Sequence, residues 1–464
     1  MNFVQLEYPL FLAAVVLVIA LTRRLSTRKA IVLAASFYFY AYWDYRFLGL
    51  LIASTLLDFS IGLAFKRVQN SGSRNALLGL SIAGNLGVLG FFKYYNFFIE
   101  SAEAVFSQWG LHSGTLSLVL PIGISFYTFQ TLSYSIDVYR GHLQPCRKLL
   151  DFTIYVTFFP QLVAGPIVRA SEFLPQLRYS PCVRTSQLYP GLMQIFRGFI
   201  KKVLIADHLA TMVDPVFASP QLFSSLTVAL AILAYAGQIY GDFAGYSDIA
   251  IGSSRLLGFE LPENFRHPYL ATSVADFWRR WHITLSTWLR DYLYISLGGN
   301  RGGTIRTYCN LMITMLLGGL WHGAAWNFVA WGAWHGFALC VERAFNRGAA
   351  SERVSWGKRL FAGGVTFCVV LFGWMLFRTS SMPQFFALLG SLTVGRDGLV
   401  WLPPFPLCAL GLLVIEHAIW ASRFRPVMMM QSDRWYSPWL VGFGLAALAL
   451  FAPSQTQPFV YFQF

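Results

Sequence analysis

Residues 311–339 read LMITMLLGGLWHGAAWNFVAWGAWHGFAL. The run contains no acid, lysine or arginine, and its ionisable side chains are those of His322 and His335. A helix needs about 20 mainly apolar residues to cross the hydrocarbon core of a bilayer, and this run is longer. Because the backbone at that depth must satisfy its own hydrogen bonds, the stretch predicts a helical intramembrane segment that carries two histidines.

The rest of the chain follows the same pattern. Of its 464 residues, 56% are hydrophobic and only 12% are charged, whereas a soluble protein has roughly 25% charged residues. Long apolar blocks recur between residues 8 and 453. We therefore expect a single all-α integral-membrane domain over residues 1–464, a polytopic helix bundle with about ten to thirteen spans. Re-entrant or interfacial helices can be part of it where protein buries their backbone.

The formal net charge is +14, from 35 Lys and Arg against 21 Asp and Glu. In a soluble protein this excess would suggest nucleic acid as a partner. Here the basic residues occupy short gaps between apolar blocks, which indicates cytoplasmic loops and a lipid bilayer as the partner, with no nucleic acid. The first of these basic loops contains Arg23, Arg24, Arg28 and Lys29, and the second contains Lys66, Arg67 and Arg74. Their positions predict a periplasmic N-terminus and a first helix that is retained in the mature protein.

Neither the six cysteines nor the eight histidines show the chain spacing of metal ligands. On this ground the sequence predicts no metal and no bound cofactor.

The most polar internal stretch is an insert at about residues 257–306. Within it, residues 274–291 read VADFWRRWHITLSTWLRD. Helical spacing places Trp278, Trp281, His282 and Trp288 on one face, and Arg279 and Arg280 mostly away from it. Two interpretations stay open: an interfacial helix with tryptophans at headgroup depth, or a site in which His282 takes part.

The insert continues as GGNRGG over residues 298–303. Glycines let backbone N–H groups approach an anion, and Arg301 and Arg306 add positive charge. The segment is either a flexible turn or a pocket for the phosphates of coenzyme A.

His322 and His335 each follow a tryptophan and precede a glycine. An ionisable group at membrane depth is costly and therefore suggests function. A neutral imidazole can take the proton from a hydroxyl as that hydroxyl attacks a thioester. The alternative is that either histidine only bonds a neighbouring helix. Asn327 is a candidate for orienting one of them.

Six stretches of the chain carry a resemblance to a known family. They are PIGISFYTFQTLSYSIDVYRG (121–141), FPQLVAGPIVR (159–169), YGDFAGYSDIAIG (240–252), LPENFRHPYLATSVADFWRRWHITLSTWLRDYLYISLGGNR (261–301), GLWHGAAWNFVAWGAWHG (319–336) and LFRTSSMPQFFALL (376–389). Together they resemble the membrane-bound O-acyltransferase family. Within it, the resemblance is greatest to the alginate O-acetyltransferase subunit and to related proteins that acetylate bacterial exopolysaccharides, including cellulose.

The resemblance implies that His322 is the catalytic histidine and His282 the second histidine of the catalytic region. It also implies a central tunnel through a bacterial inner membrane, an acetyl-CoA or other acyl thioester donor from the cytoplasm, and periplasmic partner proteins that finish transfer to a polysaccharide acceptor. Further candidates for lining the donor and substrate path, or for supporting it, are Asp242, Ser247, Asp248, Arg279, Arg280, Trp281, Trp321, Asn327 and His335.

Three other functions are alternatives to acetyl transfer onto an exopolysaccharide. A transporter would move a lipid-linked sugar or acyl carrier without chemistry, but such proteins often have two similar halves, which this sequence lacks. A D-alanyl transferase acting on a cell-envelope polymer is an alternative within the enzyme class. The third is a non-catalytic membrane subunit of a polysaccharide synthase complex.

Overall fold

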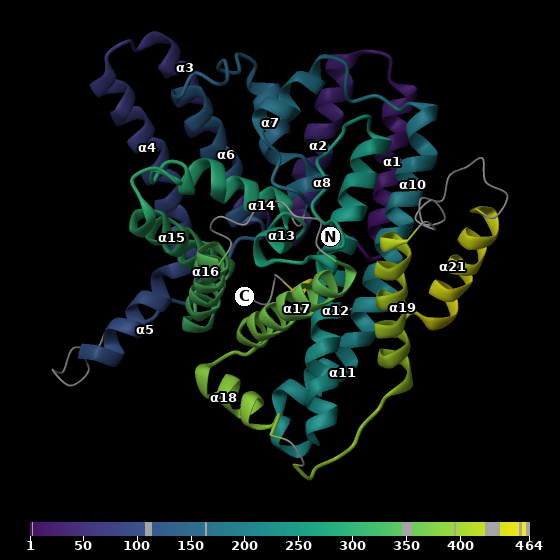
Figure 1. Ribbon diagram of the computed structural model, residues 1–464. Helices are drawn as coiled ribbons and strands as arrows, with labels where there is room; N and C mark the ends of the chain where they lie inside the picture. The colour runs from purple at the N-terminus through teal and green to yellow at the C-terminus, as the bar shows by residue number, and fades with distance from the viewer. Residues whose placement is uncertain are drawn as a thin grey trace. The chain divides into compact units, whose positions relative to one another are not determined.

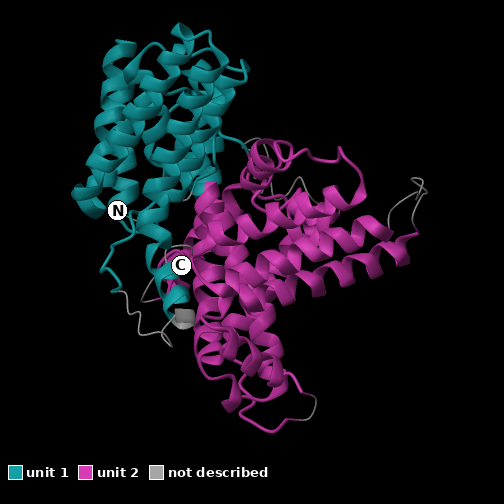
Figure 2. Ribbon diagram, turned by 90° about the vertical axis from the view of Figure 1, so that its left-hand side faces the viewer, with its two compact units in different colours: residues 1–195, 249–262 teal, residues 196–248, 263–464 magenta. Residues whose placement is uncertain are grey.

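The computed structural model describes the chain except for residues 2, 107–113, 163–164, 346–354, 394–395, 423–436, 454–456 and 461–464. Within the described residues, the regular elements are helices, and one isolated bridge joins Phe223 to Leu399. The predicted all-α class is confirmed (Figure 1). The chain forms two compact units, residues 1–195 with 249–262 and residues 196–248 with 263–464 (Figure 2).

The first unit is built from the N-terminal helices and the end of α12. Its helices are α1 (Glu7–Leu21), α2 (Leu25–Asp44), α3 (Leu48–Arg67), α4 (Ser71–Leu89), α5 (Tyr95–Phe106), α6 (Ile124–Tyr139), α7 (Leu149–Thr157), α8 (Phe159–Leu162), α9 (Ala170–Phe173) and most of α10 (Thr185–Phe199).

A polar cluster lies in the core of the first unit, between α3, α4 and α6. The carboxylate of Asp58 on α3 is fully buried. It accepts hydrogen bonds from Ser81 (2.5 Å), Asn85 (2.7 Å) and Ser135 (2.6 Å). A buried charge without such donors would be strongly unfavourable, so the cluster fixes how these three helices pack.

The second unit contains the end of α10 and most of α12, which spans Ser225–Leu256. Its other helices are α11 (Asp207–Ala218), α13 (Val274–Trp278), α14 (Ile283–Trp288), α15 (Thr304–His322), α16 (Trp326–Phe345), α17 (Trp356–Arg378), α18 (Met382–Gly390), α19 (Pro404–Ala421) and α21 (Ser437–Phe451).

An ion-pair triad is buried in this second unit. The ammonium of Lys202 lies 2.7 Å from a carboxylate oxygen of Asp207 and 2.7 Å from one of Asp242. Lys202 also donates to the carbonyl of Gln457, and Asp242 accepts from the backbone N–H of Val460. The triad therefore joins the middle of the chain to residues 457–460.

Five helical segments of the described chain are long and apolar enough to cross a membrane, and α1 and α21 are shorter apolar helices. The five segments are Leu25–Arg67, Ser71–Glu103, Ser225–Leu256, Trp356–Arg378 and Pro404–Ala421. These helices make the chain a multi-pass membrane protein. The exact number of crossings, the periplasmic N-terminus and the single-domain organisation stay predictions.

Helices α15 and α16 form a tight hairpin, seen as adjacent helices in Figure 1. Glycines permit its close packing: a Cβ on Gly319 would overlap the carbonyl of Phe328, and one on Gly332 would overlap the carbonyl of Met315. Small residues at such contacts are typical of membrane helix pairs. The intramembrane segment predicted at 311–339 is thus two helices with a turn after His322.

Candidate active site

His322 is the last residue of α15 and is buried, with 4% of its surface exposed. The chain leaves the helix through Gly323 in an extended conformation. A Cβ on Gly323 would overlap the ring of Phe328, so glycine is required for this turn to lie against the aromatic side chain. The Trp-His-Gly sequence therefore places the imidazole at a helix end inside the protein.

Two tryptophans connect three buried histidines. The ring of Trp321 lies 6.0 Å from that of His282 and 5.1 Å from that of His322, between centroids. The ring of Trp331 lies 5.0 Å from His322 and 4.9 Å from His335. The fold thus brings together three histidines that the sequence separates by up to 53 positions, counted from residue 282 to residue 335. We call these five residues the His-Trp row.

The remaining surroundings of the row are aromatic. Phe377 of α17 lies 5.3 Å from the ring of His322, and Phe243 of α12 lies 4.7 Å from the ring of His282. Trp281 packs 4.7 Å from Trp374 and stacks on Phe277, also between ring centroids. Such surroundings exclude water and strengthen electrostatic interactions inside the site.

His282 corrects one prediction. The expected continuous helix over 274–291 is interrupted: α13 ends at Trp278, and α14 begins at Ile283. His282 lies at the break with a φ of 41°, in the left-handed region that a non-glycine residue enters only at an energetic cost. Single-face spacing could not reveal this break, because the hydrogen bonds that favour it come from Asn264, outside the segment.

Asn264 fixes the orientation of His282. Its amide oxygen lies 3.2 Å from Nδ1 of His282 and also accepts from the backbone N–H and the hydroxyl of Thr284. Its amide nitrogen donates to Ser247. With an oxygen facing Nδ1, that nitrogen carries the proton of the neutral ring, and Nε2 carries the lone pair. Ser247, predicted as a lining residue, therefore supports His282 through Asn264.

Burial also controls the charge of His282, which lies in the insert outside the membrane-spanning helices. Removal from water lowers the pKa of this imidazole to about 3. The ring is consequently neutral at physiological pH, and a neutral ring can accept a proton or a hydrogen bond.

His335 is fully buried in α16, and its ring contacts Trp278, Trp331 and Phe277. Neither ring nitrogen has a hydrogen-bond partner among the described residues. The simple alternative, a histidine that bonds a neighbouring helix, is thus not seen in that part of the chain. Buried polar groups are usually paired, and a role for His335 in lining the donor or substrate path stays a prediction.

Four other predicted lining residues take part in ion pairs. Asp242 belongs to the buried triad with Lys202. Asp248 pairs with Lys201 at 2.9 Å. Asp276 pairs with both Arg279 and Arg280, and the side chain of Arg279 is 69% exposed. Asp242, Asp248, Arg279 and Arg280 thus each take part in an ion pair, and their role in lining or supporting the donor and substrate path stays a prediction.

The side chain of Asn327 donates hydrogen bonds to the carbonyl and hydroxyl oxygens of Thr379, the residue that follows α17. These hydrogen bonds do not go to a histidine, which the sequence had suggested as the partner.

The glycine segment 298–303 is an ordered turn in which Gly298, Gly299, Gly302 and Gly303 all have positive φ. Arg306 folds against Gly298 and Gly302, and Asn310 donates to Gly299. Arg301 is exposed. Whether this turn binds coenzyme A stays a prediction.

Sequence reasoning missed Asn264, Trp331 and Phe377 as members of the site. Asn264 lies in LPENFRHP, and the resemblance of this segment to the family was the available signal. Phe377 carried no signal, because one phenylalanine among 42 is not distinguishable by composition.

Comparison with known proteins decides the family. Residues 146–380, which contain the whole His-Trp row, match the sequence profile of the membrane-bound O-acyltransferase family. The chain belongs to the membrane-bound O-acyltransferase family. A probable alginate O-acetylase of Azotobacter vinelandii is 46% identical over 363 residues, which cover 76% of this chain and 70% of that protein.

Other members of the membrane-bound O-acyltransferase family are similar over comparable lengths. A probable alginate O-acetylase of Pseudomonas aeruginosa is 44% identical over 76% of this chain and 68% of its own. A peptidoglycan O-acetyltransferase of Helicobacter pylori is 35% identical over 87% of this chain and 79% of its own. The predicted family and the predicted enzyme class, an acyltransferase, are confirmed.

Proposed function

We propose that this acyltransferase moves an acetyl group from a cytoplasmic thioester, acetyl-CoA or another acyl thioester, across the bacterial inner membrane for O-acetylation of a secreted exopolysaccharide of alginate or cellulose type. The observation that carries the proposal is the burial of His322 in the His-Trp row, within the region that matches the family. The names of the alginate O-acetylase relatives support acetyl as the group and a polysaccharide as the acceptor.

In the proposed reaction, His322 is the general base. It takes the proton of the acceptor hydroxyl, on a sugar or on a periplasmic partner protein, as that oxygen attacks the thioester carbonyl. The carbon–sulfur bond then breaks, and the protonated His322 returns the proton to the leaving thiolate. His282, whose Nε2 carries a lone pair, positions the donor or stabilises developing positive charge, and Trp321 contacts both imidazoles.

The test compares ester-linked acetate on the secreted polysaccharide of cells that make the wild type or His322→Ala at equal membrane levels. We expect loss of acetate while polymer is still secreted. His142→Ala is the matched control, because His142 is exposed in the first unit. Unchanged acetate in a folded His322→Ala protein would remove His322 from catalysis. Loss of the polymer itself would instead favour a transporter or a synthase subunit.

A second acceptor follows from one specific observation. The Helicobacter pylori peptidoglycan O-acetyltransferase matches a larger share of this chain than the alginate O-acetylases do, 87% against 76%. Peptidoglycan is therefore the second candidate acceptor. Ester-linked acetate should be measured on purified cell wall from the same cultures, and dependence of wall acetate on His322 would identify peptidoglycan as the acceptor.

A further inference from the structure

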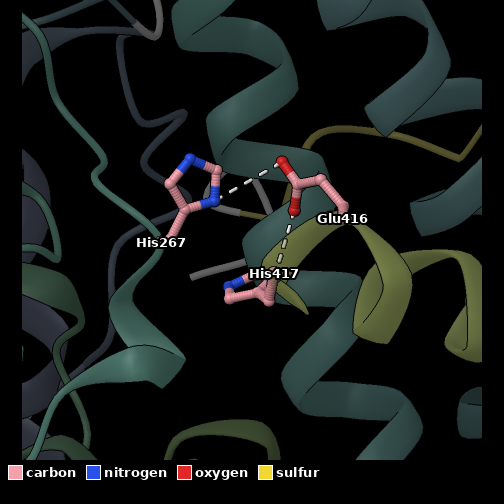
Figure 3. Close-up of side chains that lie close together, drawn as sticks. All are labelled: His267, Glu416 and His417. Atoms are coloured by element: carbon pink, nitrogen blue, oxygen red, sulfur yellow. Dashed lines mark ion pairs between the residues drawn. The ribbon is translucent and has the colours of Figure 1, made fainter. Parts of the chain in front are cut away.

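Three potential metal ligands that do not belong to the His-Trp row meet in the second unit. His267 lies in the insert, and Glu416 and His417 are consecutive residues of α19. One ligand atom from each lies within 4.8 Å of the other two. Figure 3 shows the carboxylate of Glu416 joined to each of the two histidines by an ion-pair contact. We call these residues the His-Glu-His cluster.

The distances suit a small divalent cation. Nδ1 of His267 lies 3.7 Å from one carboxylate oxygen of Glu416, and the other oxygen faces Nδ1 of His417 at 3.0 Å as an ion-pair contact (Figure 3). Ligands at about 2.0–2.1 Å in tetrahedral geometry lie roughly 3.3 Å from one another. The separation between His267 and Glu416 is close to that value, and one ligand atom from each of the three residues lies within 4.8 Å of the other two.

Hydrogen bonding supports the same interpretation. Nε2 of His417 is buried and has no hydrogen-bond partner among the described residues, while its Nδ1 lies 3.1 Å from the carbonyl oxygen of Leu413. A metal-binding histidine usually donates its second ring N–H to such a carbonyl, which fixes the ring and its tautomer. Nδ1 of His267 likewise has no hydrogen-bond partner among the described residues.

A lysine and several aromatic rings surround the cluster. The nearby cation Lys201 is held by Asp248 at 2.9 Å and lies farther from Glu416, at 3.8 Å. The ring of His267 stacks 4.3 Å from that of Trp420, and the ring of His417 stacks 5.6 Å from that of Tyr269. An aromatic shell of this kind limits access of water to a metal site.

We propose that the His-Glu-His cluster binds one divalent transition-metal ion of the zinc type. Two imidazoles and one carboxylate are an established zinc ligand set. The ion would join the insert, through His267, to α19. Chain spacing could not predict it, since His267 lies 149 positions before Glu416.

The test uses the full chain purified in detergent, with its affinity tag removed and with metal stripped by a chelator. After Zn²⁺ is added at a micromolar free concentration and unbound ion is removed, elemental analysis should find one zinc per chain. Zn²⁺ should also raise the thermal midpoint of the stripped wild type, because a ligand that binds only the folded state stabilises it.

His267→Gln and His417→Gln should each weaken zinc binding by more than about tenfold, since even outer-shell changes cost 10–100-fold. His142→Gln, at an exposed histidine outside the cluster, should bind zinc like the wild type. If the cluster variants do not fold, the absorption spectrum of Co²⁺ bound to the wild type tests the proposal instead. A spectrum typical of tetrahedral Co²⁺ without thiolate bands would support the site.

Three results would overturn the proposal. These are a folded, stripped wild type that takes up no zinc, folded cluster variants that bind zinc as tightly as His142→Gln, or a Co²⁺ spectrum with thiolate bands.

Discussion

The amide oxygen of Asn264 lies 3.2 Å from Nδ1 of His282. This contact selects the tautomer of a buried imidazole and holds it at a strained backbone position. The first prediction follows from it. Asn264→Ala should lower acyl transfer by about tenfold or more, because a positioned acid–base or charge-stabilising group loses its effect when its orientation is lost.

Transfer rates at equal membrane levels would check this prediction across a range of pH. Ser247→Ala is the comparison variant, since it removes only the partner of the Asn264 amide nitrogen and keeps the oxygen that faces His282. It should cost less activity than Asn264→Ala. Equal activity in Asn264→Ala and the wild type would show that His282 needs no such positioning.

The second prediction concerns the contact between Gly373 and His335. A Cβ on Gly373 of α17 would overlap Nε2 of His335. Gly373→Ala should therefore displace the imidazole and destabilise the protein by about 1–3 kcal/mol, the usual cost of overpacking a core. Thermal unfolding in detergent measures the change.

Gly364→Ala is a matched control on the same helix, where an added Cβ meets nothing within 4 Å. Alanine there should be neutral or slightly stabilising, because glycine is unfavourable in a helix interior. Two variants with equal stability would contradict the close packing of α17 on His335.

The third prediction concerns the buried triad. Lys202→Met leaves Asp207 and Asp242 buried without their shared cation, and such a change typically costs 3–5 kcal/mol. We expect a large loss of thermal stability and of membrane level. Lys358→Met, at an exposed position of α17, should have little effect.

Adding Asp242→Asn to Lys202→Met should recover part of the lost stability, since one uncompensated charge is removed. A double variant no more stable than Lys202→Met would mean that the loss arises from packing of the lysine stem rather than from charge.

The fourth prediction is a pH dependence. Burial lowers the pKa of His282 to about 3, against about 6.5 in an unfolded chain. Below pH 6.5 the unfolded state binds a proton that the folded state does not bind. The contribution to stability is therefore complete above pH 6.5, and it is lost as the pH falls toward 3, by at most about 1.4 kcal/mol per pH unit.

Unfolding free energies measured between pH 7 and pH 4 would test this dependence. His282→Gln should reduce the slope by about one proton, while His142→Gln should leave it unchanged. A slope that does not respond to His282→Gln would show that this imidazole is protonated in the folded protein.

Features that depend on neighbouring residues were predictable from the sequence, whereas features that depend on residues distant in the sequence were not. Apolar runs gave the helical membrane class, because burial in a bilayer constrains each run by itself. The Trp-His-Gly repeats marked His322 and His335 by local chemistry. The break at His282 depends on Asn264, and the pairing of Asp242 depends on Lys202, so both required the fold. Contacts between distant segments leave little trace in one sequence.

The long separation in sequence between the buried triad and residues 457–460 affects the order in which the protein can assemble. Lys202 bonds to the carbonyl of Gln457, which the ribosome adds 255 residues later. Asp242 similarly obtains the N–H of Val460 only after 218 further residues. During synthesis the two acids and the lysine are made before these partners exist. Assembly of the second unit is therefore completed after elongation past residue 460, and a chain stalled earlier would expose an unfinished polar core to membrane quality control.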